Sequence, residues 1–541
     1  MQCTFHGMSK KARSSTLVFV LLIELVVGAV IWFSHSPAAD AQPSMTTPPA
    51  ETQQAEKKAP SDCPKPKSTS VKKALADDLL PIGILIAVIA IVIVRLPKVE
   101  LGHSVAFRHR RLLNWLPLGL TYTFLYFGRY NMKQFQGIGL TASEYGTVFA
   151  VGSAVYGVSF LLNGPLTDRW GGRATILIAA AGSGAANVLM GYMALSGNTF
   201  GMSTVAAFST AYAINMYFQS FGAVSIVKVN AAWFHLRERG TFGGIFGVLI
   251  SLGLYFAYDV GKRITEVFEV EWLFFIPAIV LGIFFVLSFI FVRNQPSDTG
   301  HPDFDLGDAT SSGPALSVKD IFIKLITHPV IFVICLIELC SGFLRQAILQ
   351  WGVDFGKGVG LGHSFVFQNW GMVSCIAGIT GGMFAGAISD HLFQSRRGPV
   401  SSVLYGIMVG GAVMILVLFS VWPGGIGWMI AFMSMAIIGV HGMLTATASA
   451  DFAGRKNVGM AVGIIDGFVY LGSSVQSQLY GAMLPEAKIR DSANCLVNNP
   501  AAAKIENWSI WPYAMIPVAI VGFLLSLKIW NARARSGSSG H

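Results

Sequence analysis

The chain has 541 residues, of which 53% are hydrophobic and 12% are charged, and its mean hydropathy is +0.58. This composition excludes a soluble globular protein and indicates an integral membrane protein with many spans. The formal net charge is +10, but the basic residues are spread over alternate loops instead of forming one patch, which argues against a nucleic-acid partner.

The amino-terminal part of the chain precedes the main block of apolar segments. Residues 1–41 combine a basic start, an apolar run and a small-x-small triplet at 39–41, so we expect a signal peptide or an uncleaved N-terminal anchor. Residues 42–78 are rich in Pro, Lys and Ser and are predicted to form a flexible exoplasmic linker. Residues 79–97 are apolar and are predicted to form an extra transmembrane span.

Twelve apolar segments of about 20 residues then follow in one continuous block. We predict an all-α membrane protein with a twelve-helix core in two six-helix halves, residues 98–293 and 326–531. A cytoplasmic central loop at 294–325 joins the halves, and a cytoplasmic tail at 532–541 ends the chain.

Basic residues recur in the loop after every second apolar segment. By the positive-inside rule these loops are cytoplasmic, so both ends of the core are expected in the cytoplasm, and we expect a bacterial inner (cytoplasmic) membrane. The residues concerned are Arg108, Arg110, Arg111, Arg169, Arg173, Arg237, Arg239, Arg396, Arg397, Arg455, Lys456, Arg533 and Arg535.

Two arginines lie within apolar segments at matching places in the two halves. Arg129 and Arg345 are 345 − 129 = 216 positions apart. Because a cation in the hydrocarbon costs roughly 3 kcal/mol on insertion scales, each is expected to face a cavity or a partner. A guanidinium can donate paired hydrogen bonds to an anion, so the pair indicates an anion pocket. Tyr122 and Tyr126 share a helical face with Arg129 and are candidate pocket residues.

A polar motif follows the second core segment and returns after the eighth. The aspartates Asp168 and Asp390 are 390 − 168 = 222 positions apart, which is close to the offset of the two arginines and indicates a duplicated six-helix unit. We predict a cytoplasmic gate in which Asp and Arg side chains latch onto a neighbouring helix end. The alternative is an ordinary polar loop. The predicted gate residues are Gly164, Asp168, Arg169, Arg173 and Asp390.

Two carboxylates in apolar segments leave alternatives open. Glu338 lies seven residues before Arg345, and Asp466 lies in the eleventh core segment. Either could neutralise an arginine in a structural ion pair, or carry a proton and couple it to transport. His441, near a helix end, is interpreted as a satisfied polar residue.

Other chemistry has little support in the sequence. The six cysteines lack metal-site spacing, and no ATP-binding GxxxxGK[ST] run occurs. No nucleophile and base pair is consistent with the topology. We therefore expect no metal, no cofactor and no enzymatic activity.

The polar motif is similar to the cytoplasmic signature of the major facilitator superfamily, and further segments resemble its organophosphate:inorganic phosphate antiporter branch, the glycerol-phosphate and hexose-phosphate transporters. The resemblance covers about Arg110 to Trp530. The segments that carry it are Arg129-Tyr130-Asn131, Phe218-Gln219, Trp233 to Gly240, Gln295 to Gly300, Phe343-Leu344-Arg345, Gln350-Trp351 and Gly467 to Gly472.

The resemblance implies exchange of a phosphorylated metabolite for inorganic phosphate, with Arg129 and Arg345 holding the phosphate and Tyr156 matching a pocket tyrosine. The implied partners are these small anions and the lipid bilayer, and a monomer is compatible with this expectation. Phe160 and Ile250 replace a lysine and a histidine of the glycerol-phosphate exchangers, so simple glycerol phosphate is not the expected substrate. Two alternatives remain: a proton-coupled organic-anion symporter that uses Glu338 or Asp466, and a non-transporting sugar-phosphate sensor.

Overall fold

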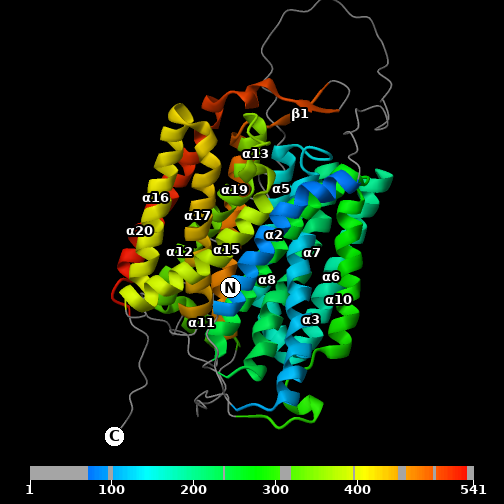
Figure 1. Ribbon diagram of the computed structural model, residues 1–541, viewed down its shortest axis with the longest axis vertical. Coiled ribbons are helices and arrows are strands. Elements are labelled where there is room, and N and C mark those ends of the chain that lie inside the picture. The colour runs from blue at the N-terminus through cyan, green and yellow to red at the C-terminus, as the bar shows by residue number, and fades with distance from the viewer. Residues whose placement is uncertain are drawn as a thin grey trace, which may run out of the picture.

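The computed structural model describes residues 71–95, 102–235, 238–304, 318–393, 397–448, 458–491 and 495–532 as a bundle of long helices (Figure 1). The predicted signal peptide or anchor at 1–41, the linker up to residue 70 and the tail after residue 532 lie outside the described residues.

The extra amino-terminal helix begins earlier than predicted. Helix α2 spans Val71–Arg95 and so includes residues 71–78, which were assigned to the linker. The sequence there, VKKALADD, is rich in residues that favour a helix and continues directly into the apolar run. The helix packs beside α15, and Leu85 is buried.

The first half contains six long helical segments, as predicted. They are α3 (Val105–Tyr130) with the short α4 (Met132–Phe135), α5 (Ala142–Trp170), α6 (Gly172–Ser196), α7 (Thr204–Trp233), α8 (Arg239–Tyr255) continued by η3 (Phe256–Val260) and α9 (Gly261–Val267), and α10 (Trp272–Phe291).

The second half repeats this order. Its segments are α12 (Pro329–Leu349) with α13 (Trp351–Gly358), α15 (Trp370–Ala387) with η5 (Ile388–Leu392), α16 (Arg397–Val421), α17 (Ile426–His441) with η7 (Gly442–Ala448), α19 (Val458–Met483) and α20 (Ile510–Lys528). Short elements connect them: η4 (Pro296–Thr299), α11 (Val318–Thr327), α14 (Phe365–Gln368), η6 (Pro423–Gly425), β1 (Lys488–Arg490), β2 (Leu496–Asn498), η9 (Pro500–Ala503) and η10 (Ile505–Trp508). The strands pair antiparallel, with Ile489 opposite Val497.

The twelve-helix fold in two halves is therefore confirmed. Within the described ranges, seven helices are individually long and apolar enough to cross a membrane. Core helices such as α3 and α7 fall outside this set because they carry polar side chains in the protein interior, among them Arg129 and Gln219.

Among the described residues, the halves meet most extensively through two helix pairs, α5 with α19 and α8 with α15. The first pair approaches closely at glycines. A Cβ on Gly157 would lie 2.8 Å from the carbonyl oxygen of Gly467, and a Cβ on Gly146 would lie 2.7 Å from that of Ser477. Only glycine fits such an approach without displacing the opposing backbone.

The two ends of the bundle differ. We call the end with β1 and β2 the hairpin end (Figure 1), and the end with the polar motif at 164–173 the motif end. At the hairpin end the segment after α19 contacts the start of α5: Arg490 of β1 pairs with Glu144 at 2.9 Å, and the backbone N–H of Ser143 donates to Glu486 at 2.8 Å. At the motif end an apolar cavity of about 370 Å³ lies between α5 and α19 and includes Phe160 and Gly164.

Candidate functional site

Arg129 lies in the centre of the bundle, in the last turn of α3, and is fully buried. Its Nε donates to Oε1 of Gln219 on α7 at 2.7 Å, and its Nη1 donates to the hydroxyl of Tyr470 on α19. Its Nη2 has no hydrogen-bond partner among the described residues. The guanidinium is thus positioned by both halves and still has a free donor.

Aromatic rings surround the same guanidinium. Its central carbon lies 4.3 Å from the ring centroid of Tyr156, 4.7 Å from that of Tyr126 and 5.4 Å from that of Tyr470. Such stacking stabilises a desolvated cation. Tyr122 lies one step further away, with its ring 5.3 Å from that of Tyr126. Of the three predicted tyrosines, Tyr126 and Tyr156 therefore contact the cation and Tyr122 supports Tyr126.

A polar network fixes the partner of Arg129. The Nε2 of Gln219 donates to Ser183 and to Asn215, both at 3.0 Å. The amide of Asn215 in turn donates to the carbonyl of Gly128 at 2.9 Å. Since this network orients the Gln219 side chain, its Oε1 remains directed at Arg129, and the arginine is preorganised before any ligand arrives.

Arg345 is the corresponding cation of the second half. It lies on α12, is 7% exposed, and its central carbon is 5.6 Å from the ring centroid of Tyr470. Its Nε and Nη2 have no hydrogen-bond partner within the described ranges. Tyr470 therefore contacts both arginines, one from each half. Sequence reasoning placed Tyr470 in a family motif but did not identify it, or Gln219, as a site residue.

Neither arginine forms an ion pair with an acidic residue that the structure describes. In the part of the chain that the structure describes, no carboxylate oxygen lies within 4.0 Å of the nitrogens of Arg129 or Arg345. A buried cation without a counterion is costly, and free guanidinium donors suit an oxyanion. This geometry disfavours the structural ion pair that the sequence left open.

Glu338 contacts a histidine instead of Arg345. Its Oε2 lies 3.1 Å from Nδ1 of His441 on α17, and Thr445 lies 3.2 Å from the same nitrogen. Glu338 is fully buried, and its other carboxylate oxygen has no partner among the described residues. Asp466 on α19 lies within electrostatic range of His441, Glu338 and Arg345, and its Oδ1 also lacks a described partner. His441 is thus a hydrogen-bonded polar residue, as interpreted from the sequence.

The predicted gate residues make contacts within the first half. Asp168 pairs with Lys228 of α7 at 2.6 Å, and both side chains are well exposed. Arg173 donates to the carbonyl of Phe289 at 2.8 Å, whereas Arg169 is exposed. Gly164 has open space around its Cα. The side chain of Asp390 lies outside the described residues, although its backbone is part of η5. The acid of the motif therefore pairs with a lysine, and such an exposed pair contributes only about 0–1 kcal/mol.

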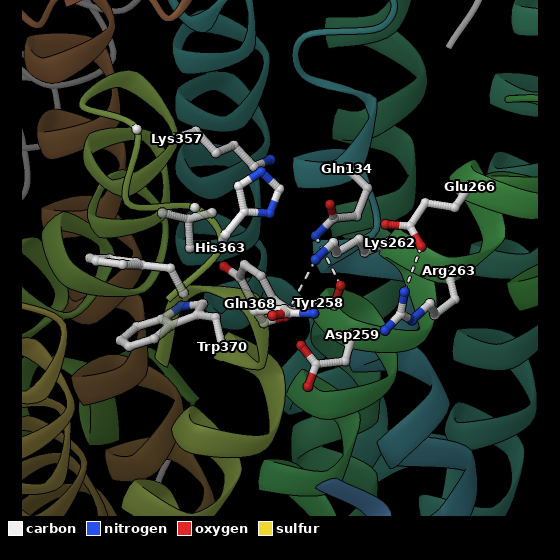
Figure 2. Close-up of a pocket in the computed structure, with 14 residues that line it drawn as sticks. Gln134, Tyr258, Asp259, Lys262, Arg263, Glu266, Lys357, His363, Gln368 and Trp370 are labelled. Carbon is white, nitrogen blue, oxygen red and sulfur yellow. Dashed lines mark hydrogen bonds and ion pairs between the residues drawn. The ribbon is translucent and has the colours of Figure 1, made fainter. Parts of the chain in front are cut away.

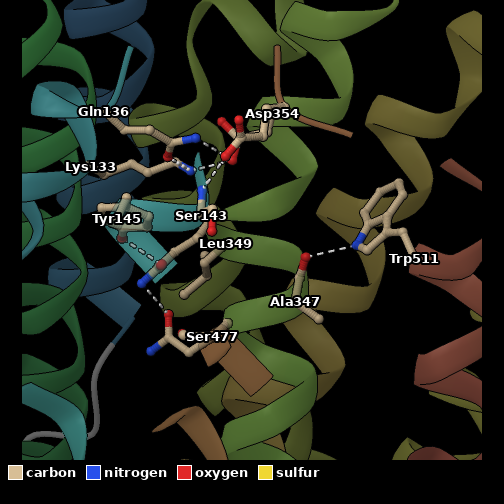
Figure 3. Close-up of polar contacts among 12 residues, drawn as sticks. Lys133, Gln136, Ser143, Tyr145, Ala347, Leu349, Asp354, Ser477 and Trp511 are labelled. Atoms are coloured by element: carbon tan, nitrogen blue, oxygen red, sulfur yellow. Dashed lines mark hydrogen bonds and ion pairs between the residues drawn. The ribbon is translucent and has the colours of Figure 1, made fainter. Parts of the chain in front are cut away.

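A buried ion pair at the hairpin end was missed by sequence reasoning. Lys133 of α4 contacts Asp354 of α13 at 2.6 Å, and their side chains are 1% and 5% exposed. Gln136 donates to the same carboxylate at 3.0 Å (Figure 3). Nearby, Tyr145 donates to Gln350 at 2.5 Å. These contacts join the halves between the arginine pair and the hairpin end, so the structure is closed at that end.

Comparison with known proteins gives consistent results. The sequence model of the Major Facilitator Superfamily matches residues 118–477. The chain is 26% identical over 473 residues to the membrane sensor protein UhpC of Salmonella typhimurium, covering 81% of this chain and 96% of that protein. It is 27% identical over 394 residues to the glycerol-3-phosphate transporter of Bacillus subtilis, covering 68% and 85%. It is 22% identical over 461 residues to a probable hexose phosphate transport protein of Chlamydia trachomatis, covering 80% and 93%.

Solved structures share the fold. The D-xylose-proton symporter has a TM-score of 0.52 at 16% identity and covers 77% of this chain and 96% of its own. The nucleoside transporter NupG has a TM-score of 0.51 at 13% identity and covers 77% and 99%. Because the family model spans most of the chain and these carriers have the same helical architecture, the chain belongs to the major facilitator superfamily.

Proposed function

We propose that this protein is a secondary transporter that moves a phosphorylated organic anion, in exchange for inorganic phosphate, by alternating access. The observation that carries the proposal is the pair of buried guanidiniums of Arg129 and Arg345, one from each half, which share Tyr470 and have free donors. The names of the glycerol-3-phosphate and hexose phosphate relatives support the substrate class.

In this proposal the phosphoryl group binds between the two arginines. Its oxygens accept from Nη2 of Arg129 and from Nε and Nη2 of Arg345, the donors that lack partners among the described residues. The hydroxyl of Tyr470 lies beside both cations and stays in contact with the anion when the halves move. Because each half supplies one arginine, the dianion links the halves and lowers the free energy of the conformation in which they close around it.

The direction of access follows from the contacts between the halves. The pair of Lys133 and Asp354 closes the hairpin end, which we propose is exoplasmic because the basic loops lie at the opposite end. The substrate site would then communicate with the cytoplasm through the motif end. Exchange requires the hairpin end to open while the motif end closes.

Uptake in proteoliposomes tests this function. Purified protein is reconstituted, and entry of labelled phosphate is measured with and without inorganic phosphate inside. We expect strong stimulation by internal phosphate, and its loss in Arg129→Lys and Arg345→Lys, because a lysine cannot reproduce the planar fork. Arg108→Lys, at an exposed arginine in the first turn of α3, is the matched control and should retain exchange. Wild-type exchange in both site variants would refute the assignment of the site.

A second candidate is proton-coupled symport of an organic anion, and the contact between Glu338 and His441 favours it. A buried carboxylate beside an imidazole can hold a proton inside the membrane. An imposed pH gradient should then drive uptake without internal phosphate, and Glu338→Gln should remove this drive. Uptake that responds to internal phosphate but not to pH would exclude it. No flux of either kind from well-folded protein would instead favour a sensor, the role in the name of the UhpC relative.

A further inference from the structure

A cavity at the hairpin end lies apart from the arginine pair and between the two halves. Its volume is about 370 Å³. Lys262 and Arg263 of α9 line one side, while Lys357 of α13 and His363 of the following loop line the other (Figure 2). The cavity therefore exists in this form only when the hairpin end is closed.

The carboxylates of the cavity are engaged by other groups. Glu266 pairs with Arg263 at 2.7 Å. Asp259 accepts the backbone N–H groups of Gly371 and Met372 at 2.7 and 2.8 Å, at the start of α15. These contacts hold both acids at the α9 and α15 walls, so they are not left to neutralise the lysines.

The lysines have little compensation. Among the described residues, the hydrogen-bond acceptor that Lys262 reaches is the carbonyl of Gln368, at 3.5 Å, the outer limit of a hydrogen bond. The charged groups that act on Lys357 are Asp354, Lys262 and Lys488, and Asp354 is already bound by Lys133 at 2.6 Å. In the described part of the chain, neither Lys262 nor Lys357 has a carboxylate oxygen within 4.0 Å. Lys357 is exposed and Lys262 is half-buried, so closure of the halves brings two like charges together at a cavity that is open to water, and a bound anion would offset their repulsion.

A tyrosine hydroxyl in the same cavity is a third possible hydrogen-bond donor to a ligand. Tyr258 lines it, is 2% exposed, and its hydroxyl makes no hydrogen bond to any described residue. A buried hydroxyl without a partner costs free energy, and ligand sites are a common reason for one. Two ammonium groups and one hydroxyl on the walls of one cavity suit a small, multiply charged oxyanion such as phosphate.

We propose that this cavity is a second anion site, which binds inorganic phosphate or a similar small dianion and thereby favours the conformation closed at the hairpin end. Lys262 comes from the first half and Lys357 from the second, so an anion between them links the halves. By linkage, opening the hairpin end weakens anion binding by the same factor by which the anion disfavours opening. The site acts on the conformational equilibrium and is distinct from the arginine pair.

Equilibrium binding of labelled inorganic phosphate to the purified full-length protein tests the site. We expect wild type to bind two phosphates per chain. The double variant Lys262→Gln with Lys357→Gln should bind one, its cavity affinity falling at least about tenfold with the charged donors removed. Lys504→Gln, at an exposed lysine of the same end outside the cavity, is the matched control and should bind two.

The outcomes separate this inference from the proposed transport site. If the double glutamine variant binds as many phosphates as wild type, the cavity inference is wrong. If wild type binds only one phosphate, and Arg129→Lys abolishes that binding while the double glutamine variant retains it, the cavity is not an anion site and the transport site stands. If wild type binds only one phosphate, and the double glutamine variant loses that binding while Arg129→Lys retains it, the cavity is an anion site and the arginine pair is not.

A labelling experiment tests the conformational claim. Ser474 is buried between α19 and α5, where its hydroxyl donates to the carbonyl of Ala150 at 2.8 Å. In an Arg129→Lys background, phosphate should slow the reaction of a Ser474→Cys side chain with a water-soluble thiol reagent. With Lys262 and Lys357 replaced by glutamine, phosphate should have no effect. Equal slowing in both proteins would overturn the claim.

Discussion

Replacing Asp354 by asparagine should open the hairpin end. The carboxylate of Asp354 is the ion-pair partner of Lys133, and the two side chains are 5% and 1% exposed. Removing one partner of a buried pair costs roughly 3–5 kcal/mol because the other charge stays buried and uncompensated. The asparagine amide keeps the size of the side chain, so the change acts mainly through charge.

The protein can avoid that cost by opening, which returns Lys133 to water. The equilibrium between the closed and open hairpin end should therefore shift towards open by at most roughly two to four powers of ten. The exposed pair of Asp168 and Lys228 provides the contrast: its side chains are 62% and 46% exposed, and its loss should cost no more than about 1 kcal/mol.

The rate at which a Ser474→Cys side chain reacts with a water-soluble thiol reagent measures this opening. We expect Asp354→Asn to raise the rate at least about tenfold and Lys228→Met to leave it nearly unchanged. The paired replacement Lys133→Met with Asp354→Leu should return the rate towards wild type, because an apolar pair can replace a buried ion pair without loss. An unchanged rate in Asp354→Asn, or equal opening in the paired variant, would show that this ion pair does not hold the hairpin end closed.

Three further changes test the central site and the contact between the halves. Tyr470→Phe removes the hydroxyl that accepts from Arg129, so the KM for phosphate exchange should rise about three- to thirtyfold while the melting temperature stays within a few degrees; an unchanged KM would contradict a role for this hydroxyl. Gln219→Glu places a carboxylate where the amide oxygen now lies 2.7 Å from Arg129, and should abolish phosphate binding at the arginine pair, so that equilibrium dialysis of the well-folded variant finds one bound phosphate fewer than in wild type. Full binding there would show that Arg129 is not a ligand. Gly157→Val should lower the melting temperature by several degrees, because a Cβ at residue 157 lies 2.8 Å from the carbonyl oxygen of Gly467. Gly164→Ala should not lower it, because Gly164 has open space around it. Equal effects of the two changes would argue against close packing of α5 and α19.

The fold and the arginine pair could be predicted from sequence because both depend on patterns that repeat. Apolar segments of spanning length mark the helices, and an arginine within such a segment is rare enough to stand out. Tyr126 is close to Arg129 because residues three apart share a helical face. These are local relationships along one helix, and each is visible in the order of residues.

The partners supplied by distant helices could not be predicted in this way. Glu338 and Arg345 share a face of α12, but seven residues correspond to a rise of about 10.5 Å, so the nearer His441 of α17 becomes the partner of Glu338. Tyr470 and Gln219 reach Arg129 only through the packing of three helices. Such contacts depend on helix rotation and tilt, which hydropathy does not specify.

The positions of Lys133 and Asp354 in the sequence also indicate the ion pair at the hairpin end. Lys133 follows Arg129 by four positions and Asp354 follows Arg345 by nine, so both lie just beyond the buried arginines, towards the same end of the bundle. Opposite charges at corresponding ends of the first helix in each half indicate a contact across the pseudo-symmetric interface. The early start of α2 also follows from helix propensity in a segment that composition alone assigned to a linker.

The most direct test of the central claim is an experimental structure of the full-length protein determined with inorganic phosphate. We expect density for a tetrahedral anion between Arg129 and Arg345, beside the hydroxyl of Tyr470 and within hydrogen-bond distance of the arginine nitrogens that have no partner among the described residues. A site without density at saturating phosphate, with the arginines bound instead to Glu338 or Asp466, would contradict it.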